Sequence, residues 1–119
     1  GEVTADSLKA RIASGKRVAR YDRVHCRALA IYAVPDSLAD VIPYYAELDS
    51  AGRAQGEALL RFVQEVVAES RARVARFPQN TVVDVHGGNH FIFLQRPPEV
   101  ARAMRAFLSA GNRSARHHE

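Results

Sequence analysis

Cysteine and long apolar runs are scarce in this sequence, and each shortage excludes a class of protein. The chain has one cysteine, Cys26, so no intrachain disulfide can form, which agrees with a reducing compartment. No apolar run approaches the roughly 20 residues of a membrane-spanning helix, and the first residues lack the apolar centre of a signal peptide. We therefore expect a cytoplasmic protein of one domain, which a length of 119 residues suits.

Dense clusters of positive charge are also missing, although the chain is basic. Lysine and arginine number 17 against 13 aspartates and glutamates, which gives a net charge of +4. The arginines recur singly and alternate with glutamates such as Glu57, Glu65 and Glu69, a pattern typical of the solvent faces of helices. Nucleic-acid-binding surfaces carry denser basic patches with stacking aromatics. We therefore expect no nucleic-acid partner.

What the sequence does contain is an alternation of apolar patterns. Residues 27–34 and 81–85 form short, nearly continuous apolar runs, typical of strands that are buried on both faces in a parallel sheet. The segments from Gln55 or Gly56 to 75 and from 97 to 111 carry apolar residues three and four apart, which predicts helices. The order strand, helix, strand, helix predicts an α/β fold with a parallel strand pair joined by a crossover.

Three further segments complete the chain. Residues 4–14 predict a short helix that ends at Gly15. Residues 38–52, interrupted by Pro43, predict a short helix and a loop over a pocket, and the polar residues after Gly111 predict a flexible tail. We thus divide the chain into a short helix with a basic connector (1–24), the α/β domain (25–111) and the tail (112–119).

Two side chains that can act together in catalysis follow the two predicted strands. Asp36 comes shortly after the first strand, and His90 follows the second beyond a Gly-Gly turn. The carboxyl ends of parallel strands meet at one edge of a sheet, where open α/β sheets keep their functional groups. A histidine that takes a proton and an acid that orients it are two members of a hydrolytic triad. Asp40 and Asp84 are weaker candidates for the acid, the second because it lies inside a strand.

The segments around both residues resemble the α/β-hydrolase family. LAIYAVPDS, which contains Asp36, is similar to the family's acid-bearing strand and turn, and HGGNHFIFL, which contains His90, is similar to the turn that delivers its histidine. The resemblance implies that residues 25–111 are the last part of such a sheet and that 1–24 end the lid region. It also implies hydrolysis of an ester, amide or similar acyl substrate through an acyl-enzyme, with Asp36 as acid, His90 as base and no cofactor.

The nucleophile of that family is missing from the sequence. It occupies a Gly-x-Ser-x-Gly turn that precedes the acid in the chain, yet only Ser7 and Ser14 precede Asp36, and neither lies in such a turn. We therefore expect a C-terminal fragment of a serine hydrolase that is inactive alone. Its partner would be the missing N-terminal portion or a second copy that pairs through open sheet edges. A stand-alone, non-catalytic α/β binding or dimerisation module is the alternative.

Other residues are weaker candidates for binding. Tyr44, Tyr45 and Phe91 can line an apolar substrate pocket, although aromatic residues more often pack in cores and loops. His86 and His90 are four apart, a spacing that binds metal on a helix, but two glycines lie between them and no third ligand is near. We expect no metal site.

Overall fold

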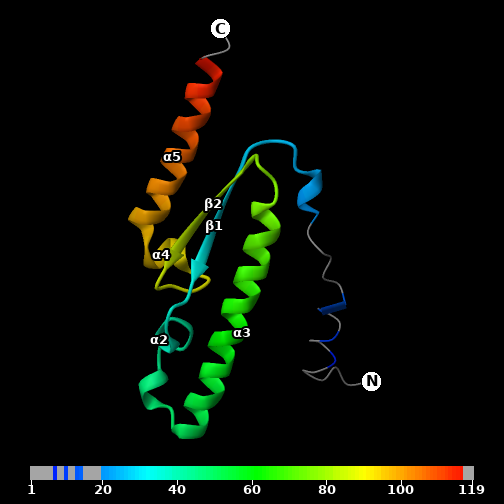
Figure 1. Cartoon of the computed structure of the whole chain (residues 1–119). Helices are drawn as coiled ribbons and strands as arrows, with labels where there is room; N and C mark the ends of the chain where they lie inside the picture. The colour runs from blue at the N-terminus through cyan, green and yellow to red at the C-terminus, as the bar shows by residue number, and fades with distance from the viewer. Residues whose placement is uncertain (1–6, 8–9, 11–12, 15–19, 117–119) are drawn as a thin grey trace.

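The computed structural model describes residues 7, 10, 13, 14 and 20–116 (Figure 1). The helix predicted over residues 4–14 lies largely outside them. Among the described helices, none combines the length and the apolarity that a membrane crossing needs. In chain order the elements are η1 (Tyr21–Arg23), β1 (Ala28–Val34), α2 (Leu38–Val41), η2 (Tyr45–Glu47), α3 (Ser50–Ala75), β2 (Asn80–His86), α4 (Ile92–Gln95) and α5 (Pro97–Arg116).

The strands β1 and β2 form a parallel pair, which confirms the predicted α/β fold. The register runs from Ala28 opposite Asn80 to Val34 opposite His86, so the two strands end side by side. Figure 1 shows α3 and α5 on opposite sides of the pair, and each helix contacts both strands. Cover on both faces is the physical reason for the continuous apolar runs that identify the strands.

The helix α3 connects the two strands and begins earlier than its apolar pattern indicates. The pattern places the start at Gln55 or Gly56, whereas the helix begins at Ser50. The side chain of Asp49 accepts a hydrogen bond from the Gly52 amide at 2.7 Å and so caps the first turn. The core of the described residues is small and comprises Leu38, Leu60, Val74, Val85 and Ile92.

The helix α5 runs past Gly111, so the predicted stop there is wrong. It extends to Arg116, and residues 112–116 of the predicted tail are helical. Gly111 serves a close approach instead, because a Cβ at this position would collide with the guanidinium of Arg27. That guanidinium lies 4.4 Å from the centre of the Phe107 ring and donates to the Phe107 carbonyl at 3.1 Å. Because Gly111 has no side chain, the Arg27 guanidinium can pack against α5 and stabilise its position.

Large apolar side chains remain exposed on both helices. Leu59, Phe62 and Val66 of α3 recur three and four residues apart, and Phe62 is 62% exposed. Met104 and Leu108 of α5 are exposed as well. Within the described part of the chain, β1 pairs with β2 on one edge and with no strand on the other. Such surfaces are characteristic of a sheet that continues or of an interface between molecules.

Candidate active site

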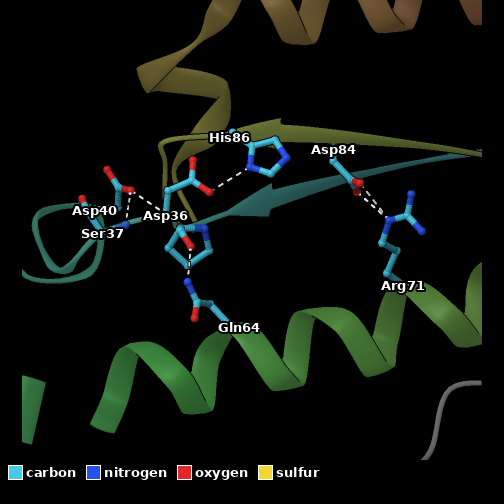
Figure 2. A network of polar contacts seen from close by, with 8 residues as sticks. Asp36, Ser37, Asp40, Gln64, Arg71, Asp84 and His86 are labelled. Atoms are coloured by element: carbon cyan, nitrogen blue, oxygen red, sulfur yellow. Dashed lines mark hydrogen bonds and ion pairs between the residues drawn. The ribbon is translucent and has the colours of Figure 1, made fainter. Parts of the chain in front are cut away.

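The acid predicted after β1 lies in a turn that is held from two sides. Pro35 is buried, and its carbonyl accepts a hydrogen bond from the Gln64 side chain of α3 at 2.9 Å. On the other side, Oδ2 of Asp40 accepts the backbone amides of Asp36 and Ser37 at 2.9 and 3.0 Å (Figure 2). Asp40, the weaker candidate for the acid, thus closes the first turn of α2. The turn presents Asp36 at the carboxyl end of β1.

The carboxylate of Asp36 is bound to His86, the last residue of β2. Nδ1 of His86 donates to Oδ1 of Asp36 at 2.9 Å (Figure 2). Both side chains are more than half exposed, at 62% for His86 and 54% for Asp36. The hydrogen bond and then the negative charge of Asp36 raise the pKa of His86 above its ordinary value. An acid–histidine pair therefore exists at the edge of the sheet that the sequence indicates.

The histidine in this pair is not the one that the sequence favours. The sequence pairs Asp36 with His90, whereas the structure joins Asp36 to His86. The register explains the difference, because His86 stands opposite Val34 and Asp36 lies just beyond the end of that strand. His90 follows farther along, after Gly87, which has a φ of +75° and redirects the chain. The signal that could have identified His86 is its position at the very end of the second apolar run.

His90 lies in the loop after β2, and the residue before it anchors this loop. Nδ2 of Asn89 donates to the carbonyl of Asp40 at 3.0 Å, and its Oδ1 accepts the Phe91 amide at 3.0 Å. The backbone amide of Asn89 donates to Oε1 of Gln95 at 3.0 Å. The rings of His90 and Phe91 meet edge to face with 5.6 Å between centroids. The loop that carries His90 is therefore tied to the segment that follows Asp36.

His90 also lines a cavity of about 850 Å³. Phe91 lines the same cavity, as do apolar side chains of β1 and α3. The other two aromatic residues predicted to bind substrate are elsewhere: Tyr45 lines a separate cavity of about 300 Å³, and Tyr44 is 61% exposed. Because its lining is mainly apolar, the larger cavity suits an apolar group beside the His90 ring.

Asp84, the remaining candidate for the acid, is engaged by α3. Nε of Arg71 donates to its two carboxylate oxygens at 2.8 and 2.9 Å (Figure 2). Asp84 lies within β2 rather than at the carboxyl edge of the sheet. Among the described residues, no three histidine, cysteine, aspartate or glutamate side chains are grouped closely enough to hold a metal ion.

Comparison with family models, with curated proteins and with solved structures gave no match for the chain. The geometry at the carboxyl edge of the strand pair is therefore the basis for a functional proposal.

Proposed function

We propose that this chain is the C-terminal portion of a serine hydrolase of the α/β-hydrolase type, acting on an ester, amide or similar acyl compound. Two segments carry the proposal: residues 35–37, which contain Asp36 and which we call the acid turn, and residues 87–91, which contain His90 and which we call the histidine loop. They meet at the carboxyl edge of a parallel strand pair. Asp36 contacts His86 at 2.9 Å there, and Asn89 joins the two segments through the Asp40 carbonyl at 3.0 Å. The single cysteine further suits a reducing, cytoplasmic compartment.

In this proposal His90 is the base, and Asp36 is the acid that orients it. Nε2 of His90 removes the proton of a serine hydroxyl while the serine oxygen bonds to the acyl carbon. The proton then passes to the leaving alcohol or amine as its bond to the acyl carbon breaks. His90 next takes a proton from water, which attacks the acyl-enzyme, and returns it to the serine oxygen as the acid product leaves. The serine itself belongs to the upstream portion of the protein.

The bond between Asp36 and His86 is compatible with this role. A carboxylate has two oxygens, each with two acceptor sites. The proposal requires Oδ2 of Asp36 to accept the Nδ1 proton of His90 while Oδ1 holds His86. The negative charge of the Asp36 carboxylate would then be shared between a protonated His86 and His90.

The uncovered apolar surface supports a parent protein with a larger sheet. The cavity beside the histidine loop is lined by residues of β1 and α4, by Val63 and Val67 of α3 and by Val100 of α5. Phe62 and Val66 continue this apolar face of α3 and are exposed. The side of α3 toward β2 carries Arg71 instead, which pairs with that strand. The apolar surface is therefore on the side of the open β1 edge, where an upstream part of the sheet would cover it.

Activity-based labelling of the gene product that contains this chain tests the proposal. We expect its coding sequence to carry an in-frame Gly-x-Ser-x-Gly segment upstream of Gly1 and a fluorophosphonate probe to label that serine. His90→Ala should lower the labelling rate by more than about 1000-fold, as loss of a triad member does. His25→Ala is the matched control, because His25 is exposed and precedes the opposite end of β1.

Three results would contradict the assignment in different ways. Labelling of the 119-residue chain by itself would show that its nucleophile is not upstream. Full labelling of the His90→Ala protein would remove His90 from the reaction. Loss of labelling in His86→Ala, with His90→Ala unaffected, would transfer the role of base to His86.

A binding or dimerisation module is the second candidate, and the exposed apolar side chains of α3 and α5 favour it. In that case Asp36 and His90 would have structural roles. A start codon directly before Gly1, together with a stable dimer in sedimentation equilibrium, would support the module and exclude the hydrolase.

A further inference from the structure

Asn89 makes three hydrogen bonds, and together they bracket His90. Its Oδ1 accepts the amide of Phe91 at 3.0 Å, so one side-chain bond spans His90 and holds the peptide after it. Its own backbone amide donates to Oε1 of Gln95 in α4 at 3.0 Å, which holds the peptide between Gly88 and Asn89. The chain is therefore held at the residue before His90 and at the peptide after it.

The third bond leads to the acid. Nδ2 of Asn89 donates to the carbonyl of Asp40 at 3.0 Å, and these residues are 49 positions apart in the sequence. The carboxylate of the same Asp40 holds the amides of Asp36 and Ser37 (Figure 2). The histidine loop and the acid turn belong to distant parts of the chain, so non-covalent contacts must set their separation. The Asn89–Asp40 bond helps to set this separation at the residue next to His90.

We propose that Asn89 is a positioning residue that holds His90 at a fixed place relative to the Asp36 carboxylate. The inference rests on the proposed function and deepens it. A histidine base must lie within hydrogen-bond reach of the serine hydroxyl and of the carboxylate that orients it. A displacement of about 1 Å can remove most of the reaction rate. An amide suits the task because it donates and accepts at once. Neither alanine nor aspartate can make both side-chain bonds of Asn89.

Backbone relaxation measured by NMR on the chain tests the positioning directly. Asn89→Ala removes both side-chain bonds, and the order parameter of the His90 amide should fall from about 0.85, typical of rigid backbone, to below about 0.6. Asn89→Asp keeps an acceptor for the Phe91 amide but loses the donor to Asp40. It should give an intermediate value, and it serves as the second variant if the alanine protein does not fold.

Asn80→Ala is the matched control. Nδ2 of Asn80 donates to the carbonyl of Val74 at 2.9 Å, so this variant also loses an amide-to-carbonyl hydrogen bond. The lost bond lies at the first residue of β2, at the opposite end from the histidine loop. We expect a lower melting temperature and an unchanged order parameter at His90. A general loss of stability is thereby separated from a loss of position.

Kinetics on the gene product complete the test. In an active parent, kcat for ester hydrolysis should fall about 100-fold in both Asn89 variants, while KM changes by less than about twofold, because the side chain bonds to backbone groups. Asn80→Ala should keep the wild-type kcat. An unchanged His90 order parameter, or an unchanged kcat in an active parent, overturns the inference. A wild-type parent without hydrolase activity overturns the proposed function instead, and the order parameter still decides whether Asn89 holds the loop.

Discussion

The substitution Gly88→Ala should loosen the loop that carries His90. A Cβ at Gly88 would collide with the side chain of Ile92 and would lie 2.9 Å from Oε1 of Gln95. That oxygen accepts the amide of Asn89 at 3.0 Å, so moving it aside breaks a hydrogen bond. Overpacking costs about 1–3 kcal/mol and the lost bond about 1 kcal/mol, whereas the stiffer unfolded chain returns at most about 1 kcal/mol. The free energy of unfolding should fall by about 2 kcal/mol.

Urea denaturation of the chain checks this figure, with Gly52→Ala as the control. A Cβ at Gly52, in the first turn of α3, would lie 3.1 Å from Oδ1 of Asp49 and 3.4 Å from the Leu48 side chain. The shortest of these contacts requires only a small shift of the Asp49 side chain, whereas the Cβ at Gly88 would collide with Ile92. A helix also favours alanine over glycine by up to about 1 kcal/mol. We therefore expect Gly52→Ala to be neutral or slightly stabilising. If Gly88→Ala were as stable as the wild type, the close packing of the loop against α4 would be refuted.

The remaining predictions concern the ion pair and the core. In Asp36→Asn, the pKa of His86 measured by NMR titration should drop toward 6.5, its ordinary value; an unchanged value would rule out the pair in solution. Asp36 raises the pKa of His86 in the folded state, so the ion pair stabilises the fold below about pH 6.5, and this stabilisation is lost as the pH rises through the raised pKa. The free energies of unfolding of wild type and variant should therefore converge at higher pH. Leu60→Ala, at a residue only 7% exposed, should lower the free energy of unfolding by about 2–5 kcal/mol. Leu59→Ala, at its half-exposed neighbour, should cost less than about 1 kcal/mol in the same urea titrations.

The two strands and the carboxyl edge of their pair could be predicted from the sequence, because strands covered on both faces have continuous apolar runs. A run such as ALAIYAV has no charged position, which is typical of a strand covered on both faces. Asp36 could be placed at the carboxyl edge for the same reason, since it comes two residues after the end of that run. The start of α3 was harder to locate, because the cap at Asp49 precedes the apolar stripe by several residues.

The partner of Asp36 could not be predicted, because it depends on register. Two parallel strands can slide past each other without any change in their apolar patterns. Only the pairing of Val34 with His86 decides which histidine meets the carboxylate. The continuation of α5 through Gly111 could not be predicted either, because the contact that explains the glycine comes from Arg27, which is distant in the sequence.

The two contacts that join the acid turn to the histidine loop also bear on how the protein folds. Asp36 and His86 are 50 positions apart, and Asn89 and Asp40 are 49 apart, so both bonds close almost the same loop of chain. The entropy of closing that loop is lost once, when β1 and β2 pair, and the second bond then forms at little extra cost. Most of the intervening chain is α3, a local structure that can form earlier. The acid–histidine pair should therefore appear late in folding, and any opening of the strand pair should break it.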